Sequence, residues 1–345
     1  MTHSSRIAPL DGVRAVAALV VLAFHAQLPG FKGAFIGVDV FFVLSGYVIT
    51  RKLRGELATT SRIDMGRFIW ERIARLWPLL LLMLTVFVAV SPWLYPDADV
   101  LKEFVLSALY VSDFTRAYWL KPDYTNHSWS LAVEMQFYLL WPLVLILLSR
   151  RPRAALTVLL GLFAAAALWR ITVFLESGWV RSYYALDTRM SGLILGSALA
   201  FVSWRPGEAV ATFAASCALV VLALCAMYLN GNFGRASVWG GVVDLATVVL
   251  IACLTVERSV VARIFAWQPL LLLGAWSYAI YIWHYPIARL TRVSFDGYTS
   301  FALTLVLTLI LAGVSHEYFE KPVGRWLRSL RVSRRLKAAY GDRRG

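Results

Sequence analysis

An arginine and a histidine, Arg14 and His25, are separated by ten apolar residues near the N-terminus. An α-helix turns about 100° and rises about 1.5 Å per residue, so eleven steps bring both side chains to within about 20° of one face, about 16 Å apart. An ionisable pair within an apolar helix is costly in lipid, so it is expected to face the protein interior and to mark a functional site. Burial disfavours the charged imidazolium, and His25 is therefore expected to stay neutral and to accept a proton.

Four further side chains are candidates for chemistry. Glu134 lies about two turns inside the apolar segment WSLAVEMQFYLLWP and is expected to be paired or functional at that depth. His284 stands two residues before the helix-disturbing Pro286 in LGAWSYAIYIWHYPI. Arg72 and Arg75 are three positions apart and would lie side by side on a helix. Ordinary cytoplasmic positive charge is the alternative explanation for these two arginines.

Membrane helices must position these residues, because 59% of the 345 residues are hydrophobic, only 16% are charged and the mean hydropathy is +0.66. An all-α polytopic membrane protein with about ten transmembrane helices is predicted. The first apolar run contains Asp11 and Arg14 and is expected to remain as a membrane helix rather than to be removed as a signal peptide. Asn126, His127 and Ser128 are predicted to cap the fourth helix. The predicted spans are 8–28, 34–50, 76–92, 127–148, 154–175, 186–204, 209–229, 238–256, 267–288 and 299–318.

Lysines and arginines are distributed unevenly between the two sides of these spans. With a cytoplasmic N-terminus, 23 of the 34 cations fall on the cytoplasmic side and 8 on the outer side, which predicts that both termini are cytoplasmic. The net charge of +14 is therefore explained by the concentration of cations on the cytoplasmic side of a bilayer, and no nucleic-acid partner is expected. The three cysteines lie in apolar runs without paired spacing, so neither a disulfide framework nor a metal site is expected.

The chain divides into a transmembrane domain, residues 1–320, and a basic cytoplasmic tail, residues 321–345, whose nine cations suit anionic lipid headgroups. The longest outer connection, 93–126, is acidic and rich in aromatic residues. This composition fits the binding of a carbohydrate or another hydroxyl-rich acceptor. It fits equally well an aromatic belt at the membrane interface.

Seven blocks in order, from Leu10 to Pro322, resemble the acyltransferase family 3 membrane O-acyltransferases. The blocks are LDGVRAVAALVVLAFHA, GVDVFFVLSGYVIT, ERIARLWP, WSLAVEMQFYLLWP, DTRMSGLILG, LGAWSYAIYIWHYPI and EYFEKP. The resemblance implies transfer of an acyl group, usually acetyl from acetyl-CoA or another acyl-CoA, to a hydroxyl of an envelope saccharide, glycolipid or glycosylated metabolite. Helices rich in alanine and valine, together with the basic balance of the chain, fit a multi-pass protein of a bacterial inner or plasma membrane. Many longer relatives add an SGNH-type hydrolase-like domain, and a stand-alone version without that domain is expected here.

The resemblance also implies roles for residues that match its blocks. Arg14 and the RxxR pair, Arg72 and Arg75, are expected to bind the phosphates of acyl-CoA through charge-assisted hydrogen bonds, and Arg14 alternatively polarises the thioester. His25 is expected to be catalytic, either as the general base that removes the hydroxyl proton of the acceptor or as an acyl-histidine relay. Glu134 is expected to be catalytic by orienting the acceptor or His25. A buried hydrogen bond that locks its helix is the alternative for Glu134.

Three further residues in matching blocks, Asp39, Tyr281 and His284, are expected to bind substrate, with helix packing as the alternative explanation. No metal is expected to take part in the reaction. The resemblance implies acetyl-CoA or another acyl-CoA as the donor substrate and a saccharide or glycosylated molecule as the acceptor.

Two other functions fit the same residues. A proton-coupled exporter or permease of an envelope precursor would use Arg14, His25 and Glu134 as a proton or substrate pathway, although no internal repeat of the kind found in transporters is visible. A non-catalytic scaffold for envelope synthesis would not depend on His25. Acyl-CoA-dependent product formation favours the enzyme, whereas gradient-driven uptake without covalent change favours the transporter.

Overall fold

The computed structural model describes residues 7–204, 206–229 and 233–330. Within these ranges all regular secondary structure is helical and no strand occurs, which confirms the all-α class. The elements are α1 (Ala8–His25), η1 (Ala34–Ile36), α2 (Gly37–Thr60), α3 (Met65–Leu94), α4 (Val100–Ala108), α5 (Ser112–Trp119), α6 (Ser128–Ser149), α7 (Pro152–Tyr184), α8 (Leu186–Leu199), α9 (Glu208–Tyr228), α10 (Phe233–Leu254), α11 (Val260–Phe265), α12 (Gln268–Ser294), α13 (Gly297–Ser315) and the π-helical turn η2 (His316–Glu320).

Eight segments of the described chain are long and apolar enough to cross a membrane, and each overlaps one of the predicted spans. The remaining two predictions, 186–204 and 267–288, fall on α8 with 14 residues and α12 with 27. The chain is a polytopic membrane protein. The count of ten spans and the cytoplasmic position of the termini stay predictions.

The third span begins earlier than the apolar pattern predicts. Helix α3 starts at Met65, where the side chain of the preceding Asp64 accepts a hydrogen bond of 2.8 Å from the backbone N–H of Arg67. The helix then continues through Pro78 without a break. The segment 65–75, which precedes the predicted span 76–92, is therefore helical, and Arg72 and Arg75 lie on one helix.

Close helix packing around the centre of the bundle depends on glycine. A Cβ atom on Gly46 of α2 would lie 2.0 Å from the carbonyl oxygen of Leu193 in α8, and one on Gly196 of α8 would lie 2.0 Å from the carbonyl oxygen of Val43. A Cβ atom on Gly274 of α12 would lie 2.1 Å from the backbone of α1. Helices in lipid approach closely where such small residues meet. Helices α1, α2, α8 and α12 are thereby held together in a central group.

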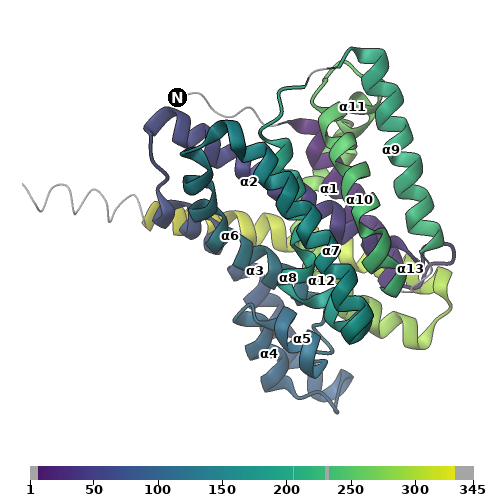
Figure 1. Cartoon of the computed structure of the whole chain (residues 1–345). Helices are drawn as coiled ribbons and strands as arrows, with labels where there is room; N and C mark the ends of the chain where they lie inside the picture. The colour runs from purple at the N-terminus through teal and green to yellow at the C-terminus, as the bar shows by residue number, and fades with distance from the viewer. Residues whose placement is uncertain (1–6, 205, 230–232, 331–345) are drawn as a thin grey trace, which may run out of the picture.

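Two short helices stand apart from the long ones. Figure 1 shows α4 and α5 together at the end of the molecule opposite α11. They belong to the connection between α3 and α6 and pack against α3, α6 and α7. The connection that was predicted from composition to be an outer segment is thus a small helical layer over one end of the bundle.

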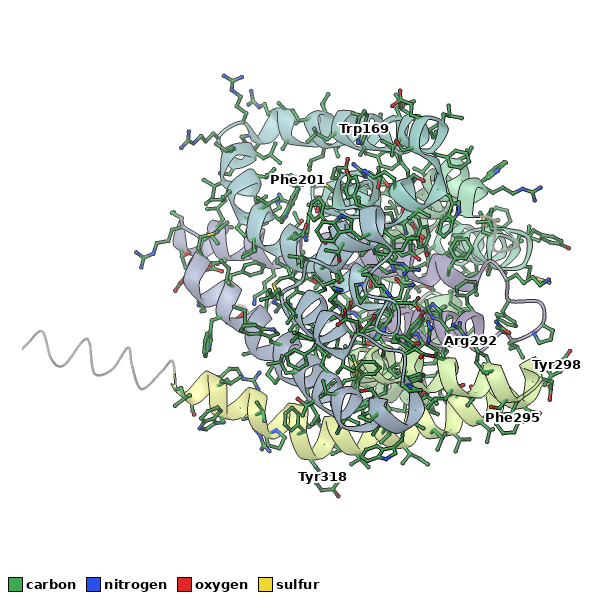
Figure 2. The ribbon with its side chains drawn as sticks, turned by 90° about the horizontal axis from the view of Figure 1, so that it is seen from below. Trp169, Phe201, Arg292, Phe295, Tyr298 and Tyr318 are labelled. Atoms are coloured by element: carbon green, nitrogen blue, oxygen red, sulfur yellow. The ribbon has the colours of Figure 1, made fainter. Side chains whose placement is uncertain are left out.

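The outside of the bundle is apolar, as expected for a surface in contact with lipid. Figure 2 shows Phe295, just after α12, Tyr298 near the start of α13, and Tyr318 pointing away from the bundle, and all three are exposed. The helix continues through η2 to Leu330, so the domain boundary placed after residue 320 falls inside a continuous helix. Residues 331–345 of the predicted basic tail lie outside the described residues.

Candidate active site

Two cavities of about 180 Å³ each lie within the helical bundle. One, which we call the arginine cavity, is bordered by α1, α2, α3, α6 and α12 and contains Arg14, Arg72 and Arg75 in its wall. The other, which we call the histidine cavity, contains His25 and His127 in its wall. The sequence led us to expect one site, and the structure divides the candidate residues between two chambers.

The arginine cavity is strongly cationic. Its charged lining residues in the described chain are four cations and one carboxylate: Arg14, Lys52, Arg72, Arg75 and Glu134. Two of the cations have acidic partners, since Arg14 lies 3.1 Å from Asp11 and Lys52 pairs with Glu71. The guanidinium of Arg72 lies over the rings of Phe68 and Tyr138, at 5.8 and 5.9 Å. The chamber is therefore suited to a polyanion such as a chain of phosphates.

Glu134 faces the arginine cavity and not His25. Its carboxylate accepts a short hydrogen bond from the hydroxyl of Ser45, and that hydroxyl lies 3.2 Å from the hydroxyl of Tyr138. This arrangement joins α6 to α2 within the membrane. The structure thus provides the buried hydrogen bond that was the alternative explanation for Glu134, and it places the carboxylate in the same chamber as the arginines.

His25 is the last residue of α1, and its ring is fixed by His284. The Nδ1 atom of His25 lies 3.0 Å from Nε2 of His284, whose Nδ1 lies 2.7 Å from the carbonyl oxygen of Tyr281. A carbonyl oxygen only accepts, so Nδ1 of His284 carries a proton and its Nε2 accepts one from Nδ1 of His25 when both rings are neutral. This assignment leaves a lone pair on Nε2 of His25, a half-buried residue in the wall of the histidine cavity.

The histidine cavity also contains His127, which sequence analysis treated only as a helix cap. That interpretation is wrong, because the N-cap of α6 has no side-chain capping hydrogen bond. The ring of His127 is buried and stacks on Tyr285 at 5.0 Å, and neither ring nitrogen forms a hydrogen bond of normal geometry to the described protein. The preceding Asn126 also leaves its buried side-chain oxygen without such a bond. The one signal in the sequence that could have indicated a buried His127 is its position directly before an apolar helix.

The remaining lining of the histidine cavity is mostly aromatic. Six aromatic side chains from four helices and η1 surround it: Phe24, Phe35, Trp129, Tyr183, Tyr184 and Tyr285, with Tyr281 at its border. Arg292 is the one lysine or arginine among the described lining residues, and none of them is acidic. Flat aromatic faces and unpaired hydrogen-bonding groups form a chamber suited to a hydroxyl-rich ring.

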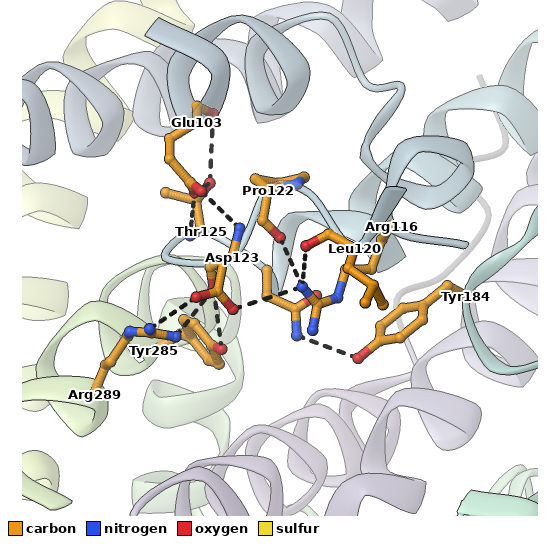
Figure 3. Close-up of polar contacts among 10 residues, drawn as sticks. Glu103, Arg116, Leu120, Pro122, Asp123, Thr125, Tyr184, Tyr285 and Arg289 are labelled. Carbon is orange, nitrogen blue, oxygen red and sulfur yellow. Dashed lines mark hydrogen bonds and ion pairs between the residues drawn. The ribbon is translucent and has the colours of Figure 1, made fainter. Parts of the chain in front are cut away.

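The loop that carries His127 is held by the acidic residues of the segment 93–126, as Figure 3 shows. The buried carboxylate of Glu103 accepts hydrogen bonds from the backbone N–H groups of Asp123 and Thr125 at 2.6 and 2.8 Å. Asp123 in turn forms an ion pair of 2.9 Å with Arg289 of α12. These carboxylates stabilise the loop and do not line either cavity. Exposed Trp93 and Trp119 in the same region suit a membrane interface.

Asp39 lies outside both cavities. It forms a buried ion pair of 2.9 Å with Arg189 of α8, and the Arg189 guanidinium lies 4.8 Å from the centre of the Tyr183 ring and 5.4 Å from that of Trp129. Both aromatic residues line the histidine cavity. Asp39 therefore contacts the site only through Arg189, whereas Tyr281 borders both cavities and His284 supports His25.

Curated relatives match this chain over most of its length. The peptidoglycan O-acetyltransferase OatA of Listeria monocytogenes is 32% identical over 93% of this chain, and the putative peptidoglycan O-acetyltransferase YrhL of Bacillus subtilis is 33% identical over 93%. The O-acetyltransferase OatA of Staphylococcus aureus is 30% identical over 93%. This chain covers only 56%, 55% and 58% of the lengths of these relatives, respectively. No solved structure matches the chain.

The match to a protein family is broader than any single motif. Residues 7–316 match the family described as an acyltransferase domain, and this range includes both cavities and every predicted site residue. The chain therefore belongs to acyltransferase family 3, the family that its seven sequence blocks resemble.

Proposed function

We propose that this chain is a membrane O-acetyltransferase that transfers an acetyl group from acetyl-CoA in the arginine cavity to a hydroxyl of a cell-wall saccharide in the histidine cavity. The observation that carries this proposal is the pair of adjoining cavities, one lined by four cations and the other containing His25, whose Nδ1 lies against His284. The names of the relatives support the reaction and favour peptidoglycan as the acceptor.

The arginine cavity would bind the donor. Coenzyme A carries a pyrophosphate and a further phosphate, and arginine binds phosphate through two parallel, charge-assisted hydrogen bonds. Arg72 and Arg75 project from α3 into this cavity, and the Nε atom of Arg72 is buried without a hydrogen-bond partner in the described chain. If the termini are cytoplasmic, as charge predicts, this chamber lies nearer the side from which acyl-CoA comes.

The histidine cavity would bind the acceptor. Sugar rings present C–H groups that pack on aromatic faces and hydroxyls that need hydrogen-bond partners. Trp129, Tyr183 and Tyr285 supply such faces, and Asn126 and His127 supply buried polar atoms that have no hydrogen-bond partner in the described protein. A saccharide in this chamber would satisfy those atoms.

His25 would act as the general base. Its Nε2 atom takes the proton of the acceptor hydroxyl as the oxygen attacks the thioester carbonyl. The carbon–sulfur bond then breaks, the carbon–oxygen ester bond remains, and the proton passes from His25 to the departing thiolate to give free coenzyme A. His284 positions His25 by accepting the hydrogen bond from Nδ1. An acyl-histidine relay would use the same lone pair as a nucleophile, and an acyl-enzyme trapped without acceptor would identify it.

The test is acetyl transfer by purified protein in lipid nanodiscs. Radiolabelled acetyl-CoA is supplied with glycan strands of peptidoglycan, and label in the glycan is measured for wild type, His25→Ala and His316→Ala. His316 pairs with Glu320 and lines neither cavity, so it is a matched histidine control. We expect His25→Ala to lose at least about 100-fold in rate while His316→Ala keeps the wild-type rate. Full activity of His25→Ala would contradict the proposal.

A further inference from the structure

The two cavities meet at two side chains. Val38 of α2 and Tyr281 of α12 are the residues, within the described chain, that line both chambers. Both are buried, and they come from different helices of the central group. A group that passes from one chamber to the other must pass between or beside these two side chains.

Tyr281 is held firmly at this border. Its hydroxyl lies 2.6 Å from the hydroxyl of Ser130 and donates a hydrogen bond of 3.0 Å to the backbone carbonyl of His127. Its own carbonyl accepts the 2.7 Å hydrogen bond from His284. The ring centre lies 6.3 Å from that of Phe41 on the arginine side and 5.7 Å from that of His127 on the other side. A ring fixed at both ends cannot swing aside freely.

Val38 lacks such constraints because its side chain is purely apolar. It has no polar atom to anchor it, and its volume contributes to how much space remains at the border that it shares with Tyr281. The space at the border can thus be changed through the side-chain volume at position 38, while hydrogen bonds hold the ring of Tyr281 in place.

We infer that Val38 and Tyr281 form an acyl-length filter between the donor and acceptor chambers. This inference rests on the proposed function and adds to it the class of donor: an acyl-CoA with a short acyl group. With the coenzyme phosphates in the arginine cavity, the thioester must reach the border for its carbonyl to meet the acceptor oxygen and Nε2 of His25. The acyl chain therefore occupies the gap at Val38, where each added methylene must displace a packed side chain.

The experiment compares acetyl-CoA with butyryl-CoA in the nanodisc assay for wild type, Val38→Ala and Val43→Ala. Val43 is a fully buried valine of the same helix that lines neither cavity, so its variant removes the same two methyl groups elsewhere. We expect wild type to prefer acetyl-CoA. Val38→Ala should raise kcat/KM for butyryl-CoA relative to acetyl-CoA by about tenfold or more, since one methylene in an apolar pocket is worth about 10- to 200-fold. Val43→Ala should keep the wild-type ratio.

A second pair of variants separates size from hydrogen bonding. Tyr281→Phe keeps the ring volume but removes both hydrogen bonds of the hydroxyl, so the ring can move and the ratio should shift toward butyryl-CoA, by less than in Val38→Ala. Val38→Phe fills the gap and should abolish acetyl transfer while leaving the affinity for coenzyme A, measured by calorimetry, within about twofold of wild type.

The outcomes are distinguishable. An unchanged ratio in Val38→Ala, or equal use of both donors by wild type, would overturn the filter and leave the proposed function standing. Absence of transfer from either donor by wild type would overturn the proposed function and the filter with it.

Discussion

At the scale of single residues, His25 depends on a partner 259 positions away in the sequence. The helical spacing of Arg14 and His25 correctly suggested that both face the interior, but no pattern indicated that His284 would contact His25. Pro286, two residues after His284, lies inside α12 and does not end the helix. The hydrogen bond from His25 to His284 determines which ring nitrogen carries the lone pair, and it leads to a kinetic prediction.

Replacing His284 by alanine should lower kcat for acetyl transfer by about 100-fold, because His25 loses the hydrogen bond that fixes its tautomer. The KM for acetyl-CoA should stay unchanged, since the donor binds in the other cavity. Steady-state kinetics with both substrates measures this split. A loss of folded protein would also lower the apparent kcat, and a lower thermal stability would reveal it; His316→Ala again serves as the control.

Asp113, in the short helix α5, gives a prediction about pH. Burial raises the pKa of its carboxyl to about 6, although Gln136 donates a 2.9 Å hydrogen bond to one of its oxygens. The folded protein therefore binds this proton more tightly than the unfolded chain, and stability falls as the pH rises from about 4 to about 6. The cost at neutral pH is about 3 kcal/mol, from a shift of about two pH units.

Asp113→Asn should remove this cost. The variant is expected to have a higher Tm than wild type at pH 7.5 and a similar Tm at pH 4.5, where the wild-type carboxyl is mostly protonated. Thermal unfolding in detergent at the two pH values measures the difference. An identical difference in Tm at both pH values would mean that ionisation of Asp113 is not its cause.

At the scale of elements, the close contact between α2 and α8 should be the part of the bundle most sensitive to side-chain volume. Gly196→Ala places a Cβ atom 2.0 Å from the carbonyl oxygen of Val43, so the two helices must separate. A loss of about 1–3 kcal/mol is expected, measured as a lower Tm. Gly161→Ala is the matched control, because its Cβ would meet no atom within 4 Å in α7. That variant should be neutral or slightly stabilising.

Sequence analysis predicted the helices well and their ends poorly. Apolar runs identify segments that cross a membrane, because lipid selects on hydrophobicity over a fixed length. The ends depend on other forces: Asp64 caps α3 through a backbone hydrogen bond, and Pro78 is accommodated within that helix. Hydropathy carries no signal for either feature.

Five of the residues singled out in the sequence line one of the two cavities, namely Arg14, His25, Arg72, Arg75 and Glu134, but their division between two cavities was not predicted. Arg14, Arg72 and Arg75 do share a cavity, as expected of residues with one role. Glu134 was linked to His25 as one possibility, and its side chain instead joins the arginine cavity through Ser45. His127 was interpreted as a cap because its neighbours are capping residues. Which side chains meet is decided by long-range helix packing, and a single sequence does not encode that in any local pattern.

At the scale of the whole molecule, the fold keeps the arginine cavity and the histidine cavity separate. Arg75→Ala should therefore raise the KM for acetyl-CoA by about tenfold or more through loss of a charge-assisted contact with phosphate. The KM for the acceptor glycan should remain as in wild type. Arg67→Ala is the control on the same helix, since Arg67 pairs with Glu56 at 2.9 Å and lines neither cavity. Equal changes in both KM values would indicate that the two chambers are not independent.

The hydrogen bond from His284 to the carbonyl of Tyr281 bears on whether protons could leak across the membrane through this protein. Two hydrogen-bonded imidazoles inside a membrane are the beginning of a proton wire, and a complete wire would dissipate the electrochemical gradient. A peptide carbonyl is too weak a base to accept the proton that His284 would pass on. A relay from His25 through His284 would therefore end at this carbonyl, and a proton taken up by His25 would return to the histidine cavity. If His25 is the general base proposed above, acyl transfer would therefore open no path for protons across the membrane through this pair of histidines.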